Sequence, residues 1–204
     1  MLFKDTKIKV RPLITSDIPD LLKWLSDPNI LKFYEGRDQS FDEKKIKHKF
    51  FRTLGNEDKC LVLYEGNPIG YIQYYELSAQ TKSNYGYKND PRLIFGMDQF
   101  IGETDYWNKG VGTMLIRSMV TYLFSNNQAD LIVMDPIVWN ERAIHVYEKC
   151  GFKKVKKLKR YVKHEGKWHD CWLIEVESND LNTNFNENSI HHLESSESRN
   201  GKLL

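Results

Sequence analysis

The stretch Arg92–Val120, RLIFGMDQFIGETDYWNKGVGTMLIRSMV, organises the rest of the chain. Its first ten residues are mostly large and apolar and predict a buried strand, so the carboxylate of Asp98 in the middle of that strand needs an explanation. The segment Lys109–Thr113 (KGVGT) then opens an amphipathic helix. Glycines at the start of a helix let backbone N–H groups approach an anion, and the helix dipole favours negative charge there. We therefore expect a strand, a glycine turn and a helix whose start suits a pyrophosphate.

The glycine pair does not identify a ligand by itself. A tight strand-to-helix turn with no ligand fits Gly110 and Gly112 equally well. The Walker pattern is absent, and the dinucleotide fingerprint G-x-G-x-x-G fails because Leu115 stands at the third glycine position. These departures argue against P-loop kinases and nicotinamide-dependent dehydrogenases.

Length and composition bound the class of protein. The 204 residues suit one domain, and 40% hydrophobic with 28% charged residues is a globular composition. The net charge of +2 favours neither nucleic acid nor membrane partners, and we interpret the basic run Lys153–Arg160 as an exposed strand, with phosphate binding as the alternative. No segment resembles a signal peptide or a membrane span of ~20 apolar residues, so we expect a cytoplasmic protein. Three isolated cysteines predict neither disulfides nor a metal site, and we expect them to be reduced and mostly buried, with a nucleophilic cysteine as the alternative.

The remaining segments alternate between strand and helix patterns. Strand patterns cover residues 7–11, 60–65, 69–77, 131–134, 152–164 and 168–177, and helix patterns cover residues 15–25, 41–54 and 141–150. Residues 79–91 are polar and predict a loop whose length is typical of functional loops. We expect one domain over residues 1–177. Residues 178–204 are rich in Asn, Ser and Glu and predict a disordered tail.

Two motifs resemble the GNAT superfamily of N-acetyltransferases. They are Lys109–Thr113 and the more specific Asn140–Phe152, NERAIHVYEKCGF. The resemblance implies an α/β fold of the α+β type, with a mixed, mostly antiparallel sheet of about seven strands and about four flanking helices. It also implies acetyl-CoA as co-substrate, with its pantetheine arm between a splayed fourth and fifth strand, Gly96–Phe100 and Leu131–Asp135. Trp107 stands where the family's pyrophosphate loop has glutamine or arginine, which leaves the backbone amides as the phosphate ligands.

Several shorter segments resemble aminoglycoside 6′-N-acetyltransferases more narrowly. They are Trp24–Leu25 (WL), Phe33–Asp38 (FYEGRD), Pro68–Gln73 (PIGYIQ), Gly96–Gly102 (GMDQFIG) and Met134–Pro136 (MDP). This resemblance implies transfer of an acetyl group to the 6′-amine of an aminoglycoside, and thus antibiotic resistance. A polycationic acceptor needs carboxylates that bind its ammonium groups and accept a proton.

The resemblance also assigns roles to individual residues. Asp98 would bind and orient the 6′-ammonium and accept its proton directly or through water, Asp135 would be the second substrate carboxylate, and Tyr147 would protonate the leaving thiolate. The implied substrate-binding residues are Asp135, Tyr34, Glu35, Gln73 and Asp90, with Tyr85 as a further polar side chain. The implied cofactor-binding residues are Met97, Gln99, Lys109, Gly110, Val111, Gly112, Thr113, Asn140, Ala143 and Lys149.

Alternatives remain for both the residues and the function. Asp98 could be a structural charge, Asp135 a turn cap before Pro136, and Tyr147 simply a core side chain. Val10–Leu13 (VRPL) resembles ribosomal-protein acetyltransferases, so the acceptor could instead be a protein N-terminus or a polyamine. A non-catalytic CoA-binding module is the third possibility. We expect a monomer or a weak homodimer that binds no nucleic acid.

Overall fold

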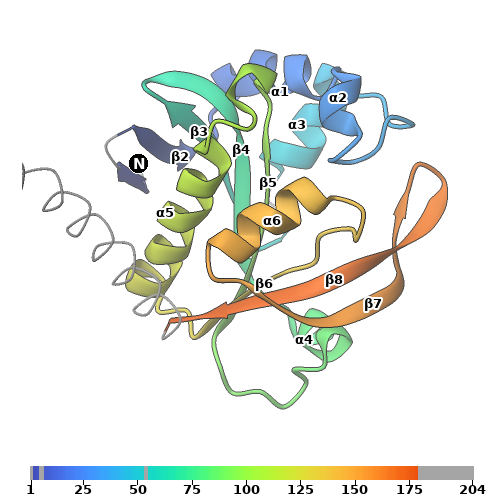
Figure 1. Cartoon of the computed structure of the whole chain (residues 1–204). Coiled ribbons are helices and arrows are strands. Elements are labelled where there is room, and N and C mark those ends of the chain that lie inside the picture. Colours follow the sequence, from blue (N-terminus) through green and yellow to red (C-terminus); the bar gives the residue numbers. More distant parts are fainter. Residues whose placement is uncertain (1, 5–6, 53–54, 179–204) are drawn as a thin grey trace, which may run out of the picture.

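A computed structural model describes residues 2–4, 7–52 and 55–178, and its centre is one mixed sheet (Figure 1). The strands are β1 (Phe3–Lys4), β2 (Ile8–Pro12), β3 (Asp58–Tyr64), β4 (Asn67–Glu76), β5 (Ile94–Ile101), β6 (Leu131–Met134), β7 (Lys153–His164) and β8 (Lys167–Glu177). Their order is β1-β2-β3-β4-β5-β6-β8-β7, and only β5 and β6 pair in parallel. This confirms the predicted mixed, mostly antiparallel sheet. The eighth strand is the two-residue β1, which the sequence pattern did not predict.

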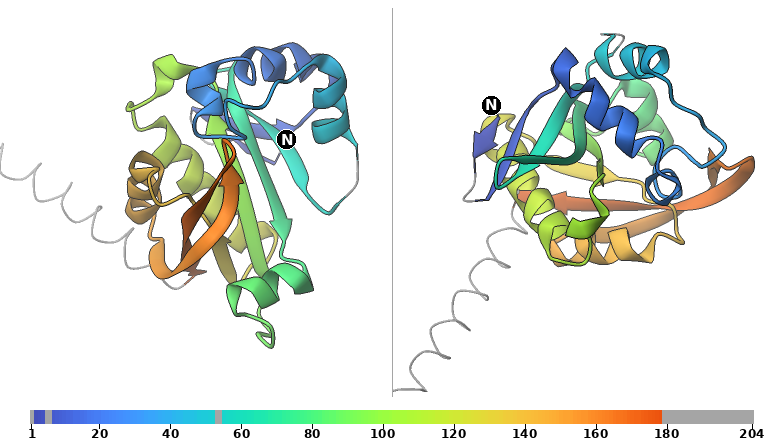
Figure 2. Two further views of the ribbon diagram at one scale, coloured as in Figure 1. Left: turned by 90° about the vertical axis from the view of Figure 1, so that its right-hand side faces the viewer. Right: turned by 90° about the horizontal axis from the view of Figure 1, so that it is seen from above.

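Helices cover both faces of the sheet. The α-helices are α1 (Ile18–Trp24), α2 (Pro28–Leu31), α3 (Glu43–Phe51), α4 (Ala79–Tyr85), α5 (Val111–Asn126) and α6 (Glu141–Lys149), and the two short 3-10 helices are η1 (Thr15–Asp17) and η2 (Thr104–Tyr106). Helices α5 and α6 lie on one face and α1 to α3 on the other (Figure 2). The described residues thus form six α-helices where about four were expected. The short α2 lies at the helical turn that Asp27 and Pro28 predict, and α4 stands where no helix was expected.

Helix α6 forms where its local signals predicted it. The Asn140 side chain accepts a hydrogen bond from the Ala143 backbone N–H at 3.4 Å, which caps the first turn. Gly151, at φ +94°, follows the helix in the left-handed conformation that glycine adopts most easily. Between these ends Ile144 and Tyr147 face the core. The motif that suggested the family is therefore a capped helix with one buried face.

The predicted loop over residues 79–91 is wrong in its first half, which is helix α4. The Ser78 hydroxyl accepts a hydrogen bond from the Thr81 N–H at 3.1 Å, and Gly86 ends the helix at φ +88°. Tyr85, the last helical residue, is buried. The helix is too short and polar to show an apolar period, so its cap and the burial of one tyrosine decide its structure.

Strands β5 and β6 separate at the point that forms the site. They pair at Ile94 with Leu131, Phe95 with Ile132 and Gly96 with Val133. Within the described residues β5 continues to Ile101 without a further partner on that side. The predicted splay of these two strands is thus confirmed, and the second half of β5 faces a gap.

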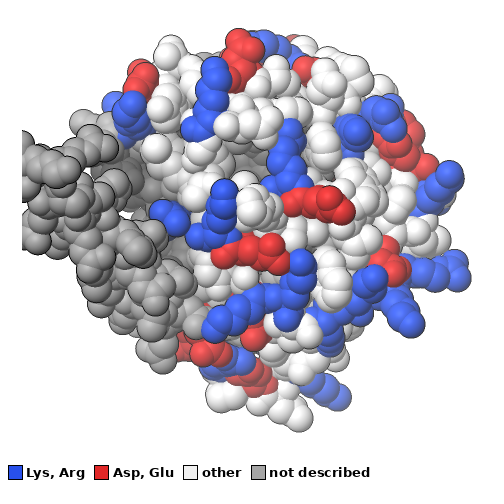
Figure 3. Space-filling view, in the orientation of Figure 1, with Lys and Arg blue, Asp and Glu red and all other residues white. Residues whose placement is uncertain are grey.

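The surface of the protein carries both basic and acidic side chains. The basic run Lys153–Arg160 lies in the exposed strand β7, as predicted, and Figure 3 shows acidic side chains interspersed with basic ones on the face that carries α6. No helix in the described part of the chain is long and apolar enough to cross a membrane. The predicted tail lies outside the described residues from residue 179 onward.

Candidate active site

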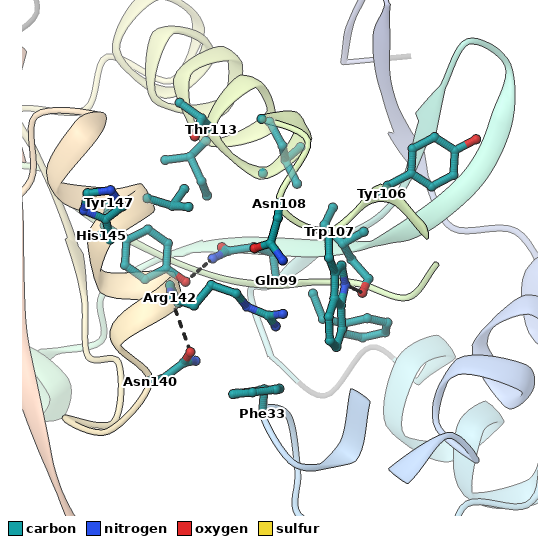
Figure 4. Close-up of a pocket in the computed structure, with 18 of the residues that line it drawn as sticks. Phe33, Gln99, Tyr106, Trp107, Asn108, Thr113, Asn140, Arg142, His145 and Tyr147 are labelled. Carbon is teal, nitrogen blue, oxygen red and sulfur yellow. Dashed lines mark hydrogen bonds between the residues drawn. The ribbon is translucent and has the colours of Figure 1, made fainter. Parts of the chain in front are cut away.

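Two adjoining cavities open where β5 and β6 separate. The larger has a volume of about 390 Å³ and lies between the start of α5, helix α6 and the segment around Trp107 (Figure 4). The smaller has a volume of about 150 Å³ and lies between the middle of β5 and the end of β6. Four residues, Phe33, Gln99, Asn140 and Tyr147, line both cavities. A ligand in one cavity can therefore reach a ligand in the other.

The larger cavity has the shape of a phosphate seat at the start of α5. Gly110 has φ +79°, and no atom lies within 4 Å of the position that a Cβ would take there. A Cβ on Gly112 would meet only a methyl carbon of Val146, at 4.0 Å. No side chain caps this helix, so its first N–H groups are available to an anion. The cradle fits the pyrophosphate that the glycine turn predicted.

The two cavities carry opposite charges. Among the described residues, the larger one is lined by Arg142, His145 and Lys149 and by no acidic side chain. The smaller one is lined by Asp98 and Asp135 and by no lysine or arginine. The arrangement suits an anionic ligand in the larger cavity and a cationic ligand in the smaller one.

Asp98 is a half-buried carboxylate held by side chains of β4. Gln73 donates a hydrogen bond to it from Nε2 at 2.9 Å, and Tyr75 donates from its hydroxyl at 3.2 Å. Burial raises the pKa of Asp98, and these two hydrogen bonds oppose the rise because they stabilise the charged form. Asp98 makes no ion pair with a described residue, which leaves its charge available to a ligand.

Asp135 follows β6 and faces the same cavity. Its one side-chain donor among the described residues is Tyr85, the last residue of α4, whose hydroxyl lies 2.9 Å from Oδ2. Burial, followed by the negative charge of Asp98, raises the pKa of Asp135 to about 7. A carboxylate with this pKa changes its charge near neutral pH.

Tyr147 stands at the wall between the cavities. Its hydroxyl accepts a hydrogen bond from Gln99 Nε2 at 2.6 Å, and burial raises its pKa above the usual value. The phenol therefore stays protonated and can donate a proton. The other amide atom of Gln99, Oε1, is buried and has no hydrogen-bond partner in the described structure. Such an orphaned acceptor is expected where a ligand supplies the missing donor.

The three cysteines take no part in this chemistry. All are buried and unpaired. Burial raises the pKa of Cys150 to about 11 and that of Cys60 and Cys171 to about 12. Their thiols are therefore protonated at neutral pH and are poor nucleophiles.

Most of the predicted site residues lie together. Tyr34, Met97, Asp98 and Asp135 line the smaller cavity, Gly110, Gly112, Thr113, Ala143 and Lys149 line the larger one, and Gln99, Asn140 and Tyr147 line both. Gln73 lies behind Asp98 as its hydrogen-bond donor. Tyr85, considered as a sugar contact, instead holds Asp135.

Besides Gln73 and Tyr85, four predicted residues line neither cavity. Asp90 is paired with Arg92 at 2.7 Å, and Glu35 is paired with Lys49 at 2.7 Å. The Val111 side chain is buried in the core, so at this position only the backbone can contribute to the phosphate seat, and Lys109 is exposed next to Gly110.

Sequence reasoning missed several side chains of the site. Phe33 and Trp139 line the smaller cavity, Arg142 lines the larger one, and Tyr75 binds Asp98. The signal for Tyr75 was present, because it shares one face of a strand with Gln73. Arg142 stood in the quoted helix motif without an assigned role.

Comparisons with known proteins agree with this geometry. Residues 14–160 match the family model described as an acetyltransferase (GNAT) domain. The chain is 27% identical over 150 residues to aminoglycoside N(6')-acetyltransferase type 1 from Klebsiella pneumoniae. The aligned residues are 72% of this chain and 74% of that protein.

Two solved structures share the fold. AAC(6')-Ib in complex with ribostamycin and coenzyme A superimposes with a TM-score of 0.72 at 22% identity, over 86% of this chain and 96% of that one. Spermidine N-acetyltransferase from Vibrio cholerae, in complex with CoA and spermine, superimposes with a TM-score of 0.71 at 17% identity, over 87% of this chain and 99% of that one. At these identities the likeness is one of fold.

Proposed function

Because the chain belongs to the GNAT acetyltransferase family, we propose that it transfers the acetyl group of acetyl-CoA to the 6′-amine of an aminoglycoside. Family membership makes it an N-acetyltransferase that uses acetyl-CoA, as the sequence predicted. The acceptor is the proposed part. One observation carries it, which is that Asp98 and Asp135 line one small cavity that no lysine or arginine of the described chain enters.

The larger cavity suits the co-substrate. Acetyl-CoA supplies a thioester carbonyl and a thiolate leaving group when it is bound. The open N–H groups at Gly112 and Thr113 suit its pyrophosphate. The orphaned Gln99 Oε1 suits an amide N–H of its pantetheine arm. These contacts would direct the reacting end toward Tyr147, where the two cavities meet.

The smaller cavity suits a cationic acceptor. Asp98 binds the 6′-ammonium and accepts its proton directly or through water, which gives the neutral amine that can attack a carbonyl. Asp135 binds a second ammonium or shares the first. Two carboxylates without internal counter-ions also attract a polycation over a distance, at a rate that falls with added salt.

Tyr147 is suited to complete the transfer by giving its proton to the leaving thiolate. Its hydroxyl is neutral because burial raises its pKa, and Gln99 fixes its orientation. General acid catalysis requires such a donor within hydrogen-bond reach of the leaving atom.

A polyamine is the second candidate acceptor, because a spermidine acetyltransferase has the same fold. Two features favour the aminoglycoside. The relative from Klebsiella pneumoniae is similar in sequence over most of both chains. The smaller cavity also has aromatic walls at Phe33, Tyr34 and Trp139, which suit the apolar faces of sugar rings better than a linear chain.

The acceptor is tested by release of free thiol from acetyl-CoA with purified protein. We expect turnover with aminoglycosides that carry a 6′-amine and little with those that lack it or with spermidine. Asp98→Asn should lower kcat/KM by roughly 100-fold or more, the usual contribution of a general base. Asp42→Asn, at the cap of α3 and outside both cavities, is the matched control and should behave as wild type. Preference for spermidine, or near-full activity of Asp98→Asn, would contradict the proposal.

A further inference from the structure

Arg142 lies in an unusual setting at the start of α6. Its guanidinium carbon is 3.8 Å from the centre of the Trp107 ring and 4.6 Å from the centre of the Phe33 ring. These two aromatic rings pack edge to face, 6.0 Å apart. Figure 4 shows the guanidinium pointing into the larger cavity between Trp107, Phe33 and Gln99. The rings thus hold a cation in place inside a ligand site.

The cation has no counter-ion within the described structure. Arg142 makes no ion pair and donates no side-chain hydrogen bond to a described residue, and no acidic side chain lines the larger cavity with it. Burial lowers its pKa, and no neighbouring carboxylate opposes that effect. The residue as a whole is nevertheless exposed, so its N–H donors face solvent and are available to an acceptor that a bound ligand brings.

The position of Trp107 indicates what the ligand is. Trp107 stands three residues before Gly110, where the phosphate loop that this segment resembles carries glutamine or arginine. Its indole N–H is already used, because it donates to the Ile101 carbonyl at 2.9 Å. The loop therefore offers an aromatic ring at this position, and α6 places a guanidinium on that ring.

We propose that Arg142 binds a phosphate oxygen of the co-substrate and that Trp107 and Phe33 serve as its platform. The loop has Trp107 in place of a glutamine or arginine, and Arg142 of α6 supplies the missing polar side chain. A guanidinium suits this task because its planar fork matches a phosphate in two hydrogen bonds and stacks on aromatic faces at the same time. The inference rests on the acetyl-CoA of the proposed function.

The test compares two probes, CoA and pantetheine, which share the thiol arm but differ in their phosphates. Both affinities are measured by calorimetry, pantetheine at millimolar concentration, for wild type and for Arg142→Gln. Arg160→Gln removes the same charge from an exposed arginine of β7 and is the matched control. Thermal unfolding confirms that each variant is folded, and Arg142→Lys replaces Arg142→Gln if the latter does not fold.

We expect Arg142→Gln to weaken CoA binding by about 10- to 100-fold, the range for a hydrogen bond to a charged group, and to leave pantetheine binding unchanged. Arg160→Gln should bind both probes as wild type does. Equal weakening of both probes would assign Arg142 to packing against the arm, and unchanged CoA binding would remove it from the site. Either result overturns the inference while wild-type turnover upholds the proposed function. Failure of the wild type to bind CoA would contradict the proposed function itself.

Discussion

Two aspartates in one cavity differ because their neighbours differ. Asp98 accepts hydrogen bonds from the side chains of Gln73 and Tyr75, whereas Asp135 accepts one side-chain hydrogen bond from a described residue, Tyr85, and also faces the charge of Asp98. Donors stabilise the charged form of a carboxyl, and a nearby negative charge destabilises it. Asp135 is accordingly the group whose charge responds to pH near neutrality, with its pKa at about 7.

Tyr85→Phe should shift the acidic limb of the pH profile of kcat/KM to higher pH. The hydroxyl of Tyr85 lowers the pKa of Asp135, so its removal raises that pKa further above about 7. The Asp135 charge that attracts the acceptor then forms only at higher pH. We expect the acidic limb of kcat/KM for the acceptor to shift upward by roughly one pH unit, with near wild-type values recovered at about pH 9.

Tyr87→Phe is the matched control for this shift. Tyr87 lies two residues after Tyr85, but its hydroxyl donates to Glu175 and it lines neither cavity. Its variant should keep the wild-type pH profile, including any part that comes from titration of the acceptor's own amines. A profile of Tyr85→Phe that coincides with wild type would show that Asp135 does not control acceptor binding.

At the scale of elements, the sequence of helix α5 has to satisfy two conflicting requirements, a stable helix and an open first turn at the larger cavity. Its sixteen residues pack Leu115, Met119 and Leu123 against the sheet. Its first turn is nevertheless opened by two glycines, which are poor helix formers. The conflict is explained by the backbone and by the larger cavity, because Gly110 has φ +79° and both glycines line that cavity without a side chain to fill it.

Gly112→Ala should change helix stability and CoA binding in opposite directions. Alanine has the higher helix propensity and its Cβ would meet only Val146 at 4.0 Å, so the free protein should gain roughly 0.5 kcal/mol in the free energy of unfolding. The same methyl group occupies space beside the phosphate seat, so CoA affinity should fall by about tenfold. Thermal unfolding with and without CoA measures both effects.

Thr121→Ala is the control on the same helix. Thr121 is exposed in the middle of α5, away from both cavities, so alanine should stabilise the free protein by a similar amount and leave CoA binding unchanged. If Gly112→Ala binds CoA as tightly as Thr121→Ala does, the phosphate seat does not lie at the start of α5.

At the scale of the whole molecule, the β7–β8 hairpin is tied to the segment that carries Phe33 and Tyr34 (Figure 1). Glu165, at the hairpin tip, accepts hydrogen bonds from the side chain and the backbone N–H of Arg37. His164 Nε2 lies 3.1 Å from the Lys32 carbonyl oxygen. These contacts hold one aromatic wall of the smaller cavity in place from the opposite end of the chain.

Glu165→Gln should therefore affect the acceptor more than the fold. Arg37 lowers the pKa of Glu165 to about 2, so the pair is charged above the ordinary carboxyl pKa of 4.5 and is lost only as pH falls through about 2. At assay pH the Arg37–Glu165 ion pair is therefore removed by substitution and not by a change of pH. We expect KM for the acceptor to rise about two- to fivefold and KM for acetyl-CoA to stay unchanged.

The exposed helical pair Glu43–Lys47 supplies the control, because Glu43→Gln removes a comparable surface contact outside both cavities. Both variants should unfold at nearly the wild-type temperature, since exposed pairs contribute little to stability. An equal rise in both KM values for Glu165→Gln would mean that the hairpin supports the whole site rather than its acceptor side.

Local signals allowed much of the fold to be predicted. The strand Leu131–Met134 and the helix between Asn140 and Gly151 were found at their observed places. Caps, glycines and apolar periods act within one or two turns of the chain, so a short window of sequence contains them. The same reasoning missed α4, although Ser78 and Gly86 bound it, because the segment has no apolar period and the burial of Tyr85 involves residues far away in the chain.

The sequence by itself determined the strand with its central acid, the glycine turn and the capped helix, because each depends on residues that are neighbours in the chain. Only the tertiary structure decided which side chains share a cavity. It placed Tyr85 on Asp135 and Arg142 on Trp107, and it turned Asp90 and Glu35 toward Arg92 and Lys49. Contacts of this kind depend on how distant elements pack, and a single sequence carries no local period that records them.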